Sequence, residues 1–410
     1  MKTNNPNKKF RFIPYRKHDL LEMIVQQGRL SGQENDFRHF YTMLSSVFHF
    51  EFHQVMESLK DAYVGINPDA DTREYNNTEQ LTEHNFVELL GGVLQKANYN
   101  RITEAELNQA LTESSLFKIR LQVDFDDFAE VLLFCRGESL REETLTSWFG
   151  LRSKIIEFIN YDRVVVYLRY NDEPQQVQSS TDFKAGSAML KLFQNVPKAD
   201  LEMLFPNTQV RMRTIDKLLI GVPAIVSGGI VITTKLGASL ILLSSLFGYW
   251  LGLSSQPVEL NKASIMVLLA GLGALGVYLW KQFSSFKNRK LRFMQTLTQN
   301  LYFKNLDNNA GVFYRLVNDA EEEECKEALL AYYILLISPQ PLSRAELDKQ
   351  VEDWMLTHWQ CEIDFEIDDA LAKLQALKLL NIENEKLSAI SISEGMRALD
   401  SRWDDYFCPE

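Results

Sequence analysis

The sequence predicts an α+β membrane protein, with a helical and small-sheet soluble domain, a transmembrane helical hairpin and a winged-helix-like domain in that order. Three observations lead to this prediction. Residues 218–280 contain only Lys235, Glu259 and Lys262 as charged residues. Before this block, apolar residues at helical spacing give way to short runs rich in β-branched residues. After it come acidic helical segments and two short strand-like segments.

Residues 1–115 are predicted to be helical. Apolar residues recur every three or four positions between Phe40 and Leu59, as on the buried face of a helix. Thr103 and Glu106 have the spacing of a capping box, in which each side chain bonds an unpaired backbone N–H group at the start of a helix. We therefore expect a helix to begin beside Thr103.

Residues 116–214 are predicted to add a small sheet to the same domain. The segments DFAEVLLFC, DRVVVYLRY and AMLKLFQNV are short, rich in β-branched and aromatic residues, and bounded by turn-forming residues. One helix is expected near residues 141–160.

The apolar block at 218–281 is predicted to be the transmembrane hairpin. It contains three uncharged stretches, at 218–234, 236–255 and 263–280, and a bilayer crossing needs about 20 apolar residues, with a range of ~17–25. Lys235 would cost ~2.5–3.5 kcal/mol at the centre of a membrane helix, so we expect it at an interface. A buried core helix is the alternative reading of such a stretch.

Basic residues on both sides of the block predict that both flanks lie on the cytoplasmic face, which requires an even number of crossings. Two crossings, by 236–255 and 263–280, are the simplest arrangement. The alternatives are a first crossing by 218–234 and a three-pass chain. Residues 282–320 then form a juxtamembrane helical linker. The basic residues after the block are Lys281, Lys287, Arg289, Lys290 and Arg292.

Small residues favour close packing of the two predicted membrane helices. Ser244, Gly248 and Gly252 lie four residues apart, as do Ala270 and Ala274. This spacing places small side chains on one face, which lets two backbones approach closely in lipid. The alternative is that these residues simply face lipid.

Residues 321–410 carry the acidic excess of the chain, with 21 Asp and Glu against eight Lys and Arg. Four glutamates open the segment EEEECKEALLAYYILL, where they are expected to complement a helix dipole. Two further helices, the first capped by Ser343 and Glu346, and a hairpin complete a winged-helix order. DNA binding requires cations that neutralise phosphates, so the charge excludes nucleic acid and favours a protein partner at this acidic domain.

Two groups of residues are candidate metal ligands. His49, His53 and Glu57 share one face of a predicted helix and could hold a transition metal. A solvated helix face is the alternative. Asp69 and Asp71 have the alternating spacing of a calcium loop, but Thr72 stands where that loop needs glycine, so an exposed turn explains them equally well. No cofactor is predicted, because no glycine-rich phosphate loop and no nucleophile elbow is present.

The strings YDRVVVYLRY, NVPKADLEMLFPNTQVRMR and LDNNAGVFYRLVNDAEEEECKEALLAYYILL resemble a family built on a domain of unknown function that includes transmembrane protein 143. The resemblance covers roughly residues 120–400. It implies a two-pass membrane protein with soluble flanks and no assigned activity, so it transfers no catalytic residue.

The leading functional hypothesis is a non-enzymatic adaptor or scaffold anchored in a bacterial cytoplasmic membrane, with both soluble domains on the cytoplasmic face. Its partners would be the lipid bilayer, a protein at the acidic domain, and further copies of the chain. One alternative is a metal- or ion-binding enzyme, and another is an oligomeric pore or transporter component.

Overall fold

The computed structural model describes most of the chain as two compact units. The first comprises residues 1–113, 124–201 and 304–410, and the second comprises 114–123 and 202–303. The described residues are 10–69, 83–112, 120–123, 125–147, 152–172, 185–207, 209–211, 237–252 and 262–408.

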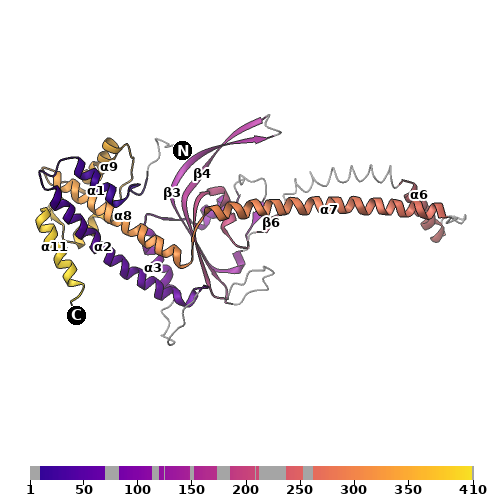
Figure 1. Cartoon of the computed structure of the whole chain (residues 1–410), viewed down its shortest axis with the longest axis horizontal. Coiled ribbons are helices and arrows are strands. Elements are labelled where there is room, and N and C mark those ends of the chain that lie inside the picture. The colour runs from indigo at the N-terminus through magenta and orange to yellow at the C-terminus, as the bar shows by residue number, and fades with distance from the viewer. Residues whose placement is uncertain are drawn as a thin grey trace. The chain divides into compact units, whose positions relative to one another are not determined.

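The first unit is built around helix α8 (Ala310–Ile337), which the N-terminal helices cover (Figure 1). Nearly every side chain of α8 from Ala320 to Leu335 is buried, including the charged ones. The helices that pack on it directly are α1 (Lys17–Gln26), α2 (Glu34–Tyr63), α3 (Glu83–Lys96), α9 (Arg344–Trp359) and α10 (Ile367–Ala376).

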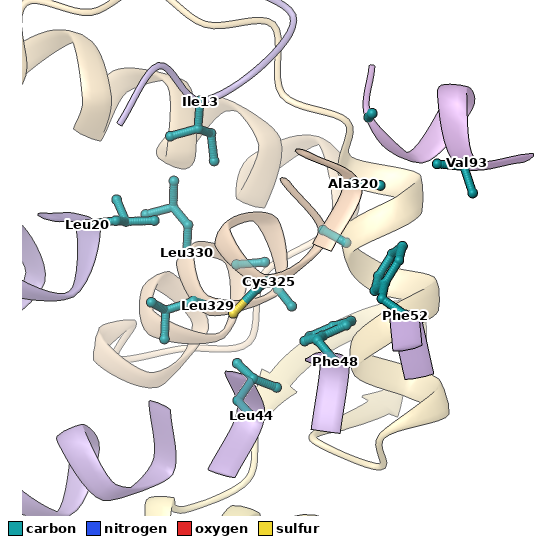
Figure 2. Close-up of a cluster of buried hydrophobic side chains, with 14 of the residues drawn as sticks. Ile13, Leu20, Leu44, Phe48, Phe52, Val93, Ala320, Cys325, Leu329 and Leu330 are labelled. Carbon is teal, nitrogen blue, oxygen red and sulfur yellow. The ribbon is translucent and has the colours of Figure 1, made fainter. Parts of the chain in front are cut away.

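Aromatic and aliphatic side chains from both ends of the chain fill this core. Phe40 of α2 stacks on Tyr332 of α8, with ring centroids 4.4 Å apart. Figure 2 shows Phe48 and Phe52 of α2 beside Cys325 of α8. Since burying such a side chain stabilises a fold by about 1.5–3 kcal/mol, the N-terminal helices and residues 310–405 depend on one another.

One antiparallel sheet belongs to the same unit. Its strand order is β1-β3-β4-β5-β7. The sheet meets α8 through β5 and β7. The strands are β1 (Asn100–Arg101), β3 (Phe128–Ser147), β4 (Arg152–Tyr170), β5 (Ala188–Pro197) and β7 (Asn305–Asn308).

Strands β3 and β4 form a long hairpin, and the helix predicted near residues 141–160 is wrong. The pairing runs without a break from Ser139 opposite Asn160 to Ser147 opposite Arg152. Thr144 pairs with Ile155 in this register, within the segment where the helix was expected. The strands predicted from DFAEVLLFC, DRVVVYLRY and AMLKLFQNV lie in β3, β4 and β5.

The C-terminal part has the predicted order of helices and a hairpin, but its first helix starts earlier. Helices α8, α9 and α10 precede the strands β8 (Leu380–Glu383) and β9 (Lys386–Ala389), and α11 (Ile392–Asp405) closes the chain. Because α8 starts at Ala310, the four glutamates from Glu321 lie inside the helix rather than at its positive end. The capping box of Ser343 and Glu346 is confirmed, and the Thr103–Glu106 bonds form before α4 (Glu104–Thr112).

In the second unit, the described residues form a two-stranded sheet and two helices. Strands β2 (Arg120–Gln122) and β6 (Gln209–Arg211) pair antiparallel. The helices are α6 (Gly237–Trp250) and α7 (Lys262–Lys304).

The predicted transmembrane hairpin is wrong. Within the described residues, no helix is both long and apolar enough to cross a bilayer. Helix α6 has 14 residues, whereas a crossing needs about 20. Helix α7 has 43 residues, but its described residues do not meet the requirement for length and apolar character together. This finding overturns the membrane fold class, the membrane-anchored adaptor function and the multi-pass localisation in a bacterial cytoplasmic membrane.

The apolar stretch from 236 to 255 misled the prediction because α6, among the described residues, ends at Trp250. Gly252, just after this end, has a φ of +71°, as is common where a helix stops. Ser244 and Gly248 lie in α6, and the Ser244 hydroxyl donates a hydrogen bond to the Ile241 carbonyl at 2.9 Å. Lys235 lies outside the described residues. Helix α7 contains Ala270, Ala274, Lys281, Lys287, Arg289, Lys290 and Arg292.

Candidate functional site

Helix α8 carries a row of charged side chains that are buried in the first unit. Five of them have less than a tenth of their surface exposed. A buried charge is tolerated only when it is paired and hydrogen-bonded, so the partners of each decide its role. The five residues are Glu321, Glu323, Glu324, Lys326 and Glu327.

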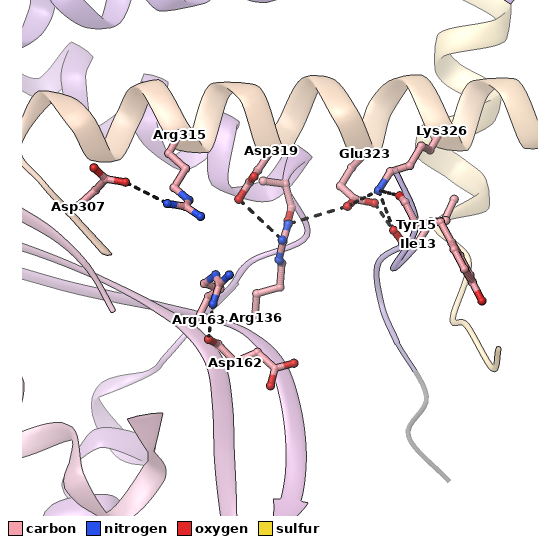
Figure 3. A network of polar contacts seen from close by, with 11 residues as sticks. Ile13, Tyr15, Arg136, Asp162, Arg163, Asp307, Arg315, Asp319, Glu323 and Lys326 are labelled. Atoms are coloured by element: carbon pink, nitrogen blue, oxygen red, sulfur yellow. Dashed lines mark hydrogen bonds and ion pairs between the residues drawn. The ribbon is translucent and has the colours of Figure 1, made fainter. Parts of the chain in front are cut away.

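One part of this row holds the N-terminal segment in place (Figure 3). The Lys326 amine donates to the carbonyls of Ile13 at 2.7 Å and Tyr15 at 3.0 Å, and pairs with Glu323 at 2.8 Å. Glu323 in turn accepts a hydrogen bond from the Ile13 backbone N–H at 3.2 Å. These bonds satisfy both charges, so this part of the row is structural.

Arg136 of β3 links the sheet to the same helix (Figure 3). Its guanidinium lies 3.7 Å from Asp319 and 4.0 Å from Glu323. It also lies over the rings of Phe12 and Tyr99, 4.7 Å and 5.1 Å from their centroids. An arginine in such a double contact acts as a clamp between elements.

The other part of the row surrounds Lys373 of α10. Its amine lies 3.0 Å from Glu324 and 2.7 Å from Glu327, and Asn98 donates to Glu327 at 3.0 Å. Burial raises the pKa of Glu327 to about 7, although Lys373 opposes the shift. Burial also raises the pKa of Glu324. Burial works against the charge of Lys373, but the two carboxylates outweigh it and raise the pKa of the amine.

A pocket opens beside this cluster and has a volume of about 180 Å³. Helices α2, α3, α8, α10 and α11 supply its walls. Apolar side chains form one part of the lining, namely Phe48, Phe52, Val55, Ala376 and Leu377. Charged side chains form the other part, namely Glu51, Lys96, Glu324, Lys373 and Arg402.

Lys96 and Arg402 differ in how they are held at the pocket. The Lys96 amine lies over the Phe52 ring, 5.4 Å from its centroid, and it makes no ion pair with any described residue. Arg402 donates to Glu51 at 3.0 Å and to the Tyr406 hydroxyl at 3.1 Å. Among the cations of the lining, Lys96 therefore has the most N–H donors free to bond a ligand.

An aromatic patch lies next to the pocket, where α2 meets the end of α11. We define it as Phe50, Trp403, Tyr406 and Phe407, whose ring centroids lie 4.7 to 5.6 Å from that of Phe50. Trp403 is 38% exposed and Phe407 is 62% exposed. Tyr406 is fixed by a hydrogen bond to Glu51, and burial together with this bond raises its pKa to about 12.

The predicted transition-metal residues do not converge in the structure. His49 is exposed and its Nδ1 lies 2.9 Å from Glu321, while Glu57 pairs with Lys60 at 2.7 Å. His53 is exposed on the same helix. Across the described ranges, no three His, Cys, Asp or Glu side chains are arranged to hold a metal ion.

The predicted calcium residues are only partly described. Asp69 follows α2, and its carboxylate accepts a hydrogen bond from the Asn309 side-chain amide. Its backbone N–H donates to Asn67 at 3.0 Å, as in an Asx turn. Asp71 lies outside the described residues.

The pocket and the aromatic patch were not predicted from the sequence. The pocket draws on five helices spread over the chain, so no local pattern marks it. The patch had a signal that could have been used. Trp403 and Phe407 are four residues apart near the end of a predicted helix that is otherwise rich in polar residues.

A comparison with solved structures finds no match. The pocket and the aromatic patch lie outside the one family domain found in the chain. That domain runs from β4 through α6 and α7 to the start of α8. Residues 161–311 match the model of the family described as Protein of unknown function (DUF3754), so the chain contains that domain.

Proposed function

We propose that this protein is a protein-interaction module, and that the aromatic patch holds a basic, apolar segment of a partner protein. The exposure of Trp403 and Phe407 beside Phe50 is the observation that carries the proposal. The resemblance to transmembrane protein 143 stays a prediction and brings no activity with it.

Aromatic side chains on a surface are the groups that most often dominate protein binding energy. Trp, Tyr and Arg are enriched among residues whose loss weakens a complex by about 2 kcal/mol or more. Trp403 and Tyr406 of the patch lie at the end of α11, where Arg402 is their neighbour. Arg402 lies over the Tyr406 ring at 5.0 Å and is bonded to Glu51. These contacts hold Tyr406 in place before any partner arrives, which lowers the entropy cost of binding for that side chain.

Charge around the patch favours a basic partner. Asp400, Asp404 and Asp405 are exposed on α11, and none of them makes an ion pair with a described residue. Residues 321–410 contain 21 acidic and eight basic residues. Such a field attracts cations and speeds their encounter. Lys or Arg over an exposed Trp or Phe ring gains a further ~0.5–1 kcal/mol.

The test is a titration of the full chain with a fluorescein-labelled twelve-residue peptide of alternating Arg and Leu. A peptide of alternating Glu and Leu serves as its matched control. We expect the basic peptide to bind and the acidic one to fail. Phe407→Ala should weaken binding by about 2 kcal/mol, or roughly 30-fold in Kd.

Two control variants separate a specific site from general stickiness. Leu356→Ala removes an apolar side chain of similar exposure on α9, and Asp353→Asn removes an exposed acid there. Both should leave the affinity unchanged, whereas Asp404→Asn should weaken it. Equal binding of the two peptides, or equal effects of Phe407→Ala and Leu356→Ala, would overturn the proposal.

A further inference from the structure

We propose that the pocket between α2, α3, α8, α10 and α11 is a binding site for a small monocarboxylate with an apolar group of about six carbons. The inference concerns a different kind of ligand from the one proposed for the aromatic patch, although Glu51 and Arg402 of the pocket lining also contact Tyr406 of the patch.

The size of the pocket sets the size of the ligand. Its volume is about 180 Å³. For comparison, an engineered apolar cavity of ~150 Å³ in another protein accepts benzene. The pocket therefore has room for one six-carbon group and a carboxylate, but not for a nucleotide or a sugar phosphate, since larger ligands use cavities of ~300–1,000 Å³.

The lining has one face suited to an apolar group. Phe48, Phe52 and Val55 come from successive turns of α2, and Leu377 follows α10 on the other side. Phe48 and Phe52 are themselves buried, so their rings are fixed in place. Figure 2 shows both rings directed toward α8. A flat or short apolar group would complete this surface without moving it.

The charged part of the lining has one cation left for an anion. Arg402 is paired with Glu51 at 3.0 Å. Lys373 is paired with Glu324 at 3.0 Å and with Glu327 at 2.7 Å. Lys96 is the remaining cation of the lining, so one carboxylate on the ligand would pair with it.

Lys96 is the residue that would hold the carboxylate. Arg402 is bonded to Glu51, and Lys373 is bonded to Glu324 and Glu327. Lys96 makes no ion pair with a described residue, and its amine already lies against Phe52 at the apolar wall. A carboxylate placed at Lys96 therefore puts its attached ring beside Phe52. Ammonium donors and carboxylates form charge-assisted bonds about twice as strong as neutral ones.

Isothermal titration of the full chain with sodium benzoate tests the proposal. A ligand with about nine heavy atoms is expected to bind with a Kd on the order of 1 mM. Benzyl alcohol has the same ring without the charge, benzylamine reverses the charge, and inorganic phosphate has the charge without the ring. Benzoate should bind at least ~10-fold more tightly than each of them, because one charged hydrogen bond is worth about 1.5–3 kcal/mol.

Two variants alter the pocket in different ways. Lys96→Met removes the proposed carboxylate partner, and Ala376→Leu fills space in the pocket from an exposed position at the end of α10. Each should reduce benzoate affinity at least tenfold, while Lys349→Met on α9 should leave it unchanged. Both pocket variants alter exposed residues, so the fold should be retained, and circular dichroism checks this. Failure of benzoate to bind, tighter binding of benzylamine, or full affinity in Lys96→Met would overturn the proposal.

Discussion

Replacing Lys373 with methionine should destabilise the first unit strongly, and more so at high pH. The side chain of Lys373 is only 11% exposed and pairs with Glu324 at 3.0 Å and with Glu327 at 2.7 Å. Methionine keeps much of the length of the side chain but removes its charge. Two carboxyl groups then remain buried without a cation.

The expected loss of stability follows from the free-energy cost of leaving a buried carboxylate without its ion-pair partner. Removing one partner of a buried ion pair typically costs about 3–5 kcal/mol, out of a total stability of about 5–15 kcal/mol for an ordinary domain. Burial raises the pKa of Glu327 from 4.5 to about 7 even with Lys373 present. The folded protein therefore holds this proton more tightly than the unfolded chain does, and wild-type stability falls as pH rises from 4.5 to 7.

Without Lys373 the folded-state pKa of Glu327 rises further, so the loss of stability continues above pH 7. Each pH unit adds up to about 1.4 kcal/mol for one carboxyl group. We expect the variant to be destabilised by about 3–5 kcal/mol at pH 8.5 and by about 2 kcal/mol less at pH 6.5.

Urea unfolding of the full chain, followed by tryptophan fluorescence at both pH values, measures the free energy of unfolding. Trp354 and Trp359 lie in the same unit and report its unfolding. Lys349→Met, at an exposed position on α9, is the matched control and should change stability by less than about 0.5 kcal/mol. A loss below about 1 kcal/mol at pH 8.5, or equal losses at the two pH values, would refute the reasoning.

Three other predictions concern packing and reactivity. Gly395→Ala should destabilise the protein by about 1–3 kcal/mol, because a Cβ atom there would lie 2.9 Å from the Phe40 ring, whereas Gly92→Ala, in open space on α3, should stabilise it by about 0.5–1 kcal/mol. Urea midpoints of the two variants that shift in the same direction would contradict this contrast. Arg136→Lys should cost about 1–3 kcal/mol in the same measurement, since lysine cannot cover two rings and bond two elements at once; an unchanged midpoint would count against the clamp. In a thiol-reagent assay at pH 8, the exposed Cys408 should react fast. Cys325 should react only on unfolding, because it is buried and burial raises its pKa to about 12. Equal reaction rates of the two thiols would contradict this prediction.

Features that depend on neighbouring residues were predicted correctly from the sequence. The capping boxes at Thr103 and Ser343 formed as expected, because each needs only four consecutive residues. The strands β3, β4 and β5 were placed for the same reason, since β-branched runs favour extended backbone wherever they occur.

Features that depend on distant partners were not predicted. Residues 141–160 read as a helix by themselves, yet the pairing of Ser139–Ser147 with Arg152–Asn160 makes them a hairpin. The lengths of the apolar stretches were taken from the sequence. The sequence alone does not show that α6 ends at Trp250. Tertiary strand pairing and the end of a helix at Trp250 each outweighed the local pattern.

The glutamates of α8 show most clearly what a local pattern leaves out. From the sequence, Glu321 and its neighbours were predicted to start a helix, where negative charge is favourable because of the helix dipole. In the structure they lie in mid-helix and face partners from several other segments, among them Lys17, Ile13, Asn98 and Lys373. Those partners lie up to about 310 residues away in the chain. The same separation hides the pocket, because Lys96 and Arg402 come from α3 and α11, which are far apart in the sequence. A buried ionic helix and an adjacent small pocket are thus two consequences of one arrangement, because Glu324 and Lys373 belong to both.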